Sequence, residues 1–165
     1  MAQMDFLFDH HVVNGLYPKA DQFDTSATTD WISMANYGRI TFLVSTGNST
    51  SDTSNGTITV LSSAVAAGTT TTALPFKYRV CASSTTVDTW GALTDAAATG
   101  FSMTAGDNYQ YLIEVTADQV VGTIDGKGFV ALKVLEVTND PIVASVTAIL
   151  SEPRYPQAIP VQAIA

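Results

Sequence analysis

Cysteine and basic residues are scarce in this chain, and each shortage removes a class of protein from consideration. The 165 residues include one cysteine, Cys81, so an intramolecular disulfide is impossible and a disulfide-stapled secreted module is not expected. Seven Lys and Arg residues oppose fifteen Asp and Glu residues, which gives a net charge of −8. Nucleic-acid binding needs a basic patch that neutralises phosphates. The basic residues are scattered singly, so we expect no nucleic-acid partner.

Long apolar runs and a secretory signal are also missing. No stretch approaches the roughly 18–20 apolar residues that cross a membrane, and the N-terminus has no basic region followed by an apolar run. We therefore expect synthesis in a cytoplasm and no membrane partner. Charged residues form 13% of the chain against 46% hydrophobic residues, which favours a globular protein. Ser and Thr take over the solvent-facing role, as is common among surface, secreted and virion proteins.

The sequence does contain β-strand patterns, and the strongest covers residues 129–150. Two runs rich in β-branched residues, 129–137 and 142–150, flank the tetrapeptide Thr-Asn-Asp-Pro. These turn-forming residues predict a hairpin, because short polar side chains bond their own backbone and proline fixes φ. In the second run apolar positions recur every second residue, so one face should lie on a core.

The first of these two runs is apolar on both faces. Val130, Leu132 and Val134 form its core face, while the opposite face is interrupted only by Lys133. A strand that is apolar on both faces needs cover on both faces. Either the rest of the domain or another subunit supplies the second cover, and we favour a subunit. The interface residues predicted on this strand are Phe129, Leu135 and Val137.

About eight or nine strand patterns follow one another, with turn signals every ten or so residues and no amphipathic helix of useful length. Residues 39–45 are typical, with Ile40, Phe42 and Val44 predicted to face inward. A second hairpin is predicted over residues 101–116. This spacing predicts an all-β fold, an antiparallel two-sheet β-sandwich, in a single domain over residues 1–165. Long loops after the second and third strands favour a jelly-roll-like arrangement.

Both ends of the chain are predicted to be extended arms. Residues 1–28 are weakly patterned, and residues 151–165 carry three prolines among small apolar residues. Extended arms dotted with apolar residues suit strand addition to a neighbouring molecule. The interface residues predicted on the arms are Phe6, Phe8, Tyr17, Arg154, Tyr155 and Ile159.

Few residues form a catalytic or metal-binding pattern. His10 and His11 are adjacent, so they should point to opposite sides of an extended chain and not converge on one metal ion. Cys81 lies in the strand pattern of residues 76–81 and is predicted to be a buried structural thiol. We therefore expect no enzyme, no cofactor and no metal site. Four aspartates are the remaining candidates for acid/base work, and all are interpreted as solvated: Asp5, Asp9, Asp118 and Asp125.

Aromatic residues raise the alternative of a carbohydrate-binding module. Tyr109 and Tyr111 fall in register with Ile113, where core packing is the default. Trp90 stands isolated in a loop-rich region and is the aromatic residue left as a candidate ligand contact.

Several strings of the sequence resemble the small capsid decoration proteins, also called cement or head-stabilising proteins, of tailed bacteriophages. They are FDHHVVNGLY, SMANYGR, YLIEV and AILSEPRY, at residues 8–17, 33–39, 111–115 and 148–155. The resemblance implies a non-enzymatic β-sandwich that is synthesised in a bacterial host cytoplasm and lies on the outer surface of the capsid, in the virion. Its partners would be the major capsid protein and copies of itself, often as a homotrimer, and the family has no shared catalytic residue.

Three functions therefore stay open at the level of sequence. The first is a capsid decoration protein that bridges capsid subunits and stabilises the shell. The second is a carbohydrate- or receptor-binding jelly roll of a phage fibre or surface protein, with Trp90 and the loops 46–56 and 62–72 forming the site. The least favoured is a hydrolase with an unusual carboxylate site.

Overall fold

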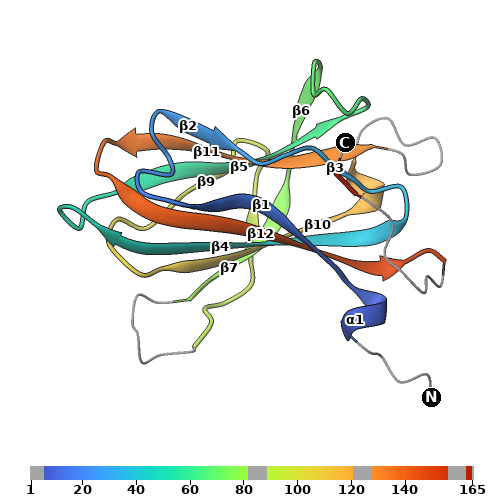
Figure 1. Ribbon diagram of the computed structural model, residues 1–165, viewed down its shortest axis with the longest axis horizontal. Helices are drawn as coiled ribbons and strands as arrows, with labels where there is room; N and C mark the ends of the chain where they lie inside the picture. Colours follow the sequence, from blue (N-terminus) through green and yellow to red (C-terminus); the bar gives the residue numbers. More distant parts are fainter. Residues whose placement is uncertain (1–5, 82–88, 121–127, 156–162, 165) are drawn as a thin grey trace.

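Two antiparallel β-sheets pack face to face and form a β-sandwich (Figure 1). The computed structural model describes residues 6–81, 89–120, 128–155 and 163–164. Twelve strands lie in these residues, five of them only two to four residues long. The all-β, two-sheet prediction is confirmed.

The first sheet, called sheet A, contains six strands in the order β1-β12-β4-β10-β7-β8. Every pairing between neighbours in this order is antiparallel. Its strands are β1 (His11–Lys19), β4 (Tyr37–Ser49), β7 (Phe76–Cys81), β8 (Thr94–Ala96), β10 (Gln110–Thr116) and β12 (Ile142–Pro153).

The second sheet, sheet B, has the order β2-β11-β5-β6, with β3 also paired to β11 and β9 to β5. Two short helices complete the described structure, α1 (Phe6–Asp9) and the 3-10 helix η1 (Ala117–Gln119). No helix among the described residues is long and apolar enough to cross a membrane. The strands of sheet B are β2 (Ser26–Thr28), β3 (Ile32–Ser33), β5 (Asn55–Ser63), β6 (Thr71–Leu74), β9 (Phe101–Ser102) and β11 (Phe129–Thr138).

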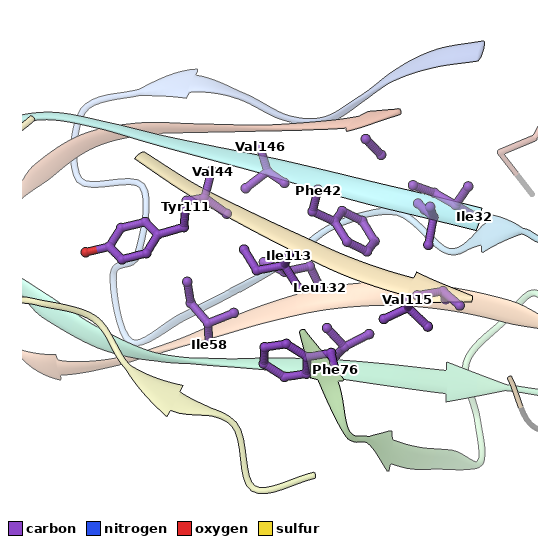
Figure 2. Close-up of a cluster of buried hydrophobic side chains, with 14 of the residues drawn as sticks. Ile32, Phe42, Val44, Ile58, Phe76, Tyr111, Ile113, Val115, Leu132 and Val146 are labelled. Carbon is purple, nitrogen blue, oxygen red and sulfur yellow. The ribbon is translucent and has the colours of Figure 1, made fainter. Parts of the chain in front are cut away.

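The core lies between the two sheets and is built from the alternating positions of their strands (Figure 2). In β4 the predicted inward residues Ile40, Phe42 and Val44 are all fully buried. Sheet B contributes Ile58 and Leu132 from the opposite side. Period-2 alternation therefore identified the core face correctly, because successive side chains of a strand point to opposite sides of a sheet.

The hairpin predicted over residues 129–150 is wrong. Strand β11 pairs with β2, β3 and β5 in sheet B, whereas β12 pairs with β1 and β4 in sheet A. The segment between them therefore crosses from one sheet to the other. Asp140 lies in this crossing and is buried, and its carboxylate accepts hydrogen bonds from the β4–β5 loop. A turn residue that bonds a distant loop in this way does not close a hairpin.

The hairpin predicted over residues 101–116 is also a crossing. Strand β9 pairs with β5 in sheet B, and β10 pairs with β4 and β7 in sheet A. In the connection, the carboxylate of Asp107 accepts the backbone N–H of Ser49 at 2.6 Å and its hydroxyl at 2.8 Å. Three sheet-to-sheet connections, β4–β5, β9–β10 and β11–β12, are thus held together at one end of the sandwich by two aspartates.

The N-terminal arm predicted over residues 1–28 belongs mostly to the sandwich. Strand β1 pairs with β12 from His11 to Lys19, and β2 pairs with β11. The weak pattern of β1 has a physical reason, since two register shifts and the half-exposed edge position disturb its alternation.

The C-terminal arm predicted over residues 151–165 returns to its own domain where it is described. Ser151 to Pro153 continue β12, and Ala163 is 3% exposed within the core cluster. The backbone N–H of Ser33 donates to the carbonyl of Ala163 at 2.8 Å, and Ile164 bridges to Ile32. These contacts close one side of the sandwich next to β3.

Candidate interaction surface

Strand β11 presents exposed apolar side chains only at its C-terminal end. Its inward residues Val130, Leu132 and Val134 are fully buried, as predicted. On the outward face, Leu135 is 47% exposed and Val137 is 64% exposed. The predicted interface residues Leu135 and Val137 are therefore available to a partner. In the same strand Phe129 is half-buried and Ala131 is fully buried. The domain itself therefore covers the N-terminal end of β11.

The predicted residues near the N-terminus lie on α1 and β1. The Phe6 ring is half exposed and stacks on the His10 ring, with centroids 4.5 Å apart. Tyr17, in the edge strand β1, is 74% exposed. The side chain of Phe8 lies outside the described part of the chain.

The predicted residues near the C-terminus follow β12. The backbone N–H of Arg154 donates to the carbonyl of Asn36 at 2.9 Å, while its side chain is exposed. Tyr155 is exposed, and Ile159 lies outside the described residues.

These residues form two groups rather than one patch. Figure 1 places α1 and the end of β12 at one end of the sandwich and the C-terminal end of β11 at the other. The edge strand β1 runs between the two ends. A partner that contacted both groups would lie along β1.

Strand β1 has one free edge, because its only partner in the described structure is β12. A hollow of about 230 Å³ borders this strand, and it is lined by His11, Val12, Val13, Asn14, Tyr17, Ala163 and Ile164. Pro18 and the register shifts after Asn14 hinder strand addition along the C-terminal half of β1. Only the half before Asn14 retains an edge suited to pairing.

A row of alternating charges crosses the outer face of sheet A. In the order β12, β4, β10, β7 and β8 it consists of Glu152, Arg39, Glu114, Lys77 and Asp95. We call this row the charge ladder. Arg39 forms ion pairs with Glu114 and Glu152 on either side, and Lys77 forms one with Asp95.

The geometry of the ladder follows from strand register. Glu114 lies directly opposite Lys77, and Lys77 opposite Asp95. The pKa of Arg39 is raised above its ordinary value, and the hydrogen bond to Glu152 is the largest cause. Exposed ion pairs of this kind each contribute only about 0–1 kcal/mol to stability. The ladder therefore matters more for fixing side-chain positions than for holding the fold. The ladder could not be predicted from the sequence, because its five members come from five separate strands.

A larger hollow, of about 520 Å³, lies over the β10–β7–β8 part of the ladder. Its described lining combines apolar residues, Pro75, Phe76 and Ala96, with charged and polar ones. The latter are Arg39, Lys77, Asp95, Glu114, Thr116, Asp118 and Gln119.

Other residues considered from the sequence do not converge on a reaction centre. His10 stacks on Phe6, whereas Nδ1 of His11 lies 3.3 Å from the hydroxyl of Tyr37, so the two imidazoles do point in different directions. Cys81 is buried, as predicted. Two of the four candidate aspartates, Asp5 and Asp125, lie outside the described residues. Within the described ranges, no three His, Cys, Asp or Glu side chains gather to hold a metal ion.

The aromatic candidates are largely part of the core. Tyr111 is fully buried, and its hydroxyl accepts the backbone N–H of Thr104 at 3.2 Å. Burial raises the pKa of Tyr111 to about 12. Trp90 is half-buried, bridges through its backbone to Cys81 and is not among the described residues that line either hollow.

The fold and surface together define an antiparallel β-sandwich with an exposed edge strand and an exposed apolar strand end. Comparison of the sequence with protein-family models gave no match, and comparison with curated proteins gave none either.

Proposed function

We propose that this protein is a non-enzymatic structural virion protein that binds the outer surface of a tailed-phage capsid. It would act as a homo-oligomer, as a trimer by the resemblance, and stabilise the shell by bridging major capsid protein subunits. The observation that carries the proposal is the exposed apolar end of β11. Leu135 and Val137 lie side by side on one strand face and are about half exposed or more. The other residues of β11 are buried or half-buried, so we assign the subunit contact to this end of the strand.

The energy of this contact sets the size of the interface. Full burial of a large apolar side chain contributes about 1.5–3 kcal/mol, and these two are already partly buried. Association costs roughly 4–15 kcal/mol in lost translational and rotational freedom. Leu135 and Val137 therefore need further contact surface. Edge strand β1, with Val12 at 50% exposure and Tyr17 at 74%, is the surface we assign to that role.

The placement of the ends changes the mechanism that the sequence suggested. Ala163 and Ile164 pack against β3 of their own domain, so this part of the tail does not reach a neighbour. In the proposal, β1 and the end of β11 make the contacts instead of a free C-terminal arm. Phe6 and Tyr155 form a secondary contact region at the opposite end.

The alternative carbohydrate-binding site at Trp90 gains no support from the geometry. Trp90 is half-buried, and the loop before β5 is tied down by Asp107 and Asp140. We therefore propose no second principal function at that position.

The test compares the oligomeric mass and shell binding of two surface variants. We expect the double variant Leu135→Asp/Val137→Asp to shift the mass measured by light scattering from oligomer to monomer. It should also reduce co-sedimentation with capsids of the phage that carries this chain. Both changes introduce a charge that an interface would bury. The matched control is Val143→Asp, an exposed valine on β12 in sheet A.

Two results would overturn the proposal. One is a wild-type protein that is monomeric and leaves capsids unbound. The other is a double variant that behaves like Val143→Asp in both measurements while circular dichroism shows that all three proteins are folded.

A further inference from the structure

The hollow over the charge ladder has walls whose polar groups are held in place. Arg39 pairs with Glu114 on one side of it, and Lys77 pairs with Asp95 on another, with 2.5 Å between the paired atoms in each case. The side chain of Glu114 is 38% exposed, and that of Lys77 is 53% exposed. Both side chains are therefore partly accessible to a ligand.

The third wall comes from the short helix η1. Oε1 of Gln119 accepts the backbone N–H and the hydroxyl of Thr116, and its Nε2 donates to the carbonyl of Pro75 at 3.0 Å. These bonds lock the amide of Gln119 against β7 and β10. Asp118 precedes it, exposed at the rim. The wall is pre-organised, so a ligand need not order it on binding.

The remaining lining is apolar and comes from one short stretch and one facing residue. Pro75 is exposed, and Phe76 and Ala96 are buried beneath the surface. Phe76 and Ala96 lie opposite each other in the β7–β8 pair. The hollow thus combines one exposed apolar residue, Pro75, with a rim that interleaves donors and acceptors.

This combination selects a class of ligand. Two positive and three negative side chains line the hollow, and both cations are already paired, so a simple anion meets no free positive charge. A nucleic acid is disfavoured by the net charge of −8. A sugar ring has an apolar C–H face and hydroxyl groups that both donate and accept. A volume of about 520 Å³ lies within the range of small-molecule pockets, about 300–1,000 Å³.

We propose that this hollow on the outer face of sheet A binds a neutral saccharide. The ring lies against Pro75, and its hydroxyl groups bond the free carboxylate oxygens of Glu114 and Asp118 and the ammonium of Lys77. The site is separate from the end of β11 and does not depend on the shell-binding role.

The experiment is a titration of the ¹⁵N-labelled full chain, followed by amide chemical shifts, with glucose, galactose and N-acetylglucosamine as separate probes. With at least one probe at millimolar concentration, we expect saturable shifts that cluster at Lys77, Asp95, Glu114 and Gln119. Glycerol is the control for non-specific hydroxyl contact and should leave these amides unmoved. The variant Glu114→Gln should raise the dissociation constant about tenfold, because it replaces a charged acceptor with a neutral one.

The ladder supplies its own matched control. Glu152 pairs with the same arginine, but it is not among the residues that line the hollow. Glu152→Gln should leave the dissociation constant within about twofold of wild type, because it removes only the ion pair between Arg39 and Glu152, which lies outside the hollow. The proposal fails if no sugar moves the four amides, if glycerol moves them equally, or if Glu152→Gln weakens binding as much as Glu114→Gln. Each of these outcomes leaves the light-scattering and capsid tests unaffected.

Discussion

Asp140 holds a loop that lies almost ninety positions away in the sequence. Its carboxylate accepts the backbone N–H groups of Thr50, Ser51 and Thr53 at 3.0–3.2 Å, and the Thr53 hydroxyl at 3.1 Å. Hydrogen bonds of this kind favour the ionised form, while burial favours the neutral form. Burial is the largest single effect on Asp140 and raises its pKa. The bonds from Thr53 and Ser51 together outweigh it, so the pKa lies below its ordinary value.

Two neighbouring carboxyl groups, those of Asp52 and Asp107, have pKa values shifted in opposite directions. Hydrogen bonds from the Ser49 backbone and hydroxyl lower the pKa of Asp107. A hydrogen bond with Asp107 raises the pKa of Asp52, foremost among its causes. As the pH falls, Asp52 therefore takes up a proton before Asp107 does. The hydrogen bonds from Ser49 to the ionised Asp107 persist to a lower pH.

We predict that Asp140→Asn lowers stability at neutral pH and flattens its dependence on acid. An amide offers one acceptor where the carboxylate offers two, and its NH₂ group would face backbone donors. Because the folded pKa of Asp140 is depressed, its contribution is fully present above the unfolded value of about 3.9 and is lost as pH falls through the folded value. Thermal unfolding measured from pH 7 down to acid should show a steep loss in wild type and a shallower loss in the variant.

The control for this prediction is Asp30→Asn, at an exposed aspartate next to β3. Its melting temperature should follow that of wild type at every pH. Equal melting curves for Asp140→Asn and wild type would mean that the loop bonds contribute no net stability.

No local signal in the sequence marks Asp140 for this role. Asn139-Asp140-Pro141 has turn composition, but the chain crosses from sheet B to sheet A there and does not close a hairpin. What the composition does not reveal is the set of partners, since Thr50 and Thr53 are 90 and 87 positions away. The same limit explains why the charge ladder was missed.

At the scale of a single element, β11 shows how unequal the two faces of one strand are. Leu132 is fully buried between the sheets, whereas Leu135, three residues later, is 47% exposed on the opposite face. Burial and cavity formation decide the cost of a truncation, so residue type alone is a poor guide.

We predict that Leu132→Ala lowers the free energy of unfolding by about 2–5 kcal/mol. The matched substitution Leu135→Ala should cost less than about 1 kcal/mol in the monomer, because nearly half of that side chain is already in solvent. Urea denaturation at a protein concentration that keeps the chain monomeric measures both values. Equal losses for the two variants would show that the outward face of β11 is covered in solution.

The alternation of apolar residues predicted individual strands well and their partners poorly. Strand β7 spans residues 76–81, as the sequence predicted, and the inward positions of β4 are the predicted ones. Both predicted hairpins are sheet-to-sheet crossings, since Gly, Asn, Asp and Pro serve either connection equally well. Strand pairing depends on which distant strand supplies the complementary edge, and periodicity carries no information about that choice.

For the whole molecule, β12 is the strand that joins β1 to the rest of sheet A. It lies between β1 and β4, and β1 has no other strand partner among the described residues. Five fully or nearly fully buried side chains of this strand also fill the core: Ile142, Ala144, Val146, Ala148 and Leu150.

We therefore predict that a chain ending at residue 141 does not fold. It loses two strand pairings of sheet A and a large share of the core at once, which exceeds the marginal stability of a domain of this size. Amide dispersion in the NMR spectrum and a cooperative melting transition should both be absent. A truncated chain with native-like dispersion would contradict this view of β12.

Two sheets and one core were predictable because they follow from strand count, turn spacing and the absence of amphipathic helices. The interface residues predicted on β11 differ in exposure. Leu135 and Val137 are exposed as an interface requires, whereas Phe129 is half-buried beside β3. The exposure of an apolar side chain depends on which loops return over it, as the segment at Ala163 does next to Ile32.

The pairing of β1 with β12 has a consequence for biosynthesis. More than a hundred residues separate Lys19 from Pro153, and ribosomes add roughly 5–20 residues per second. The first strand to leave the ribosome therefore waits on the order of ten seconds for β12, its strand partner in the described part of the chain. During that time β4 also presents an open edge. Neighbouring nascent chains on one messenger RNA carry the same unpaired strands. Slow translation of residues 142–153 would therefore favour strand pairing between chains over the native pairing within one chain.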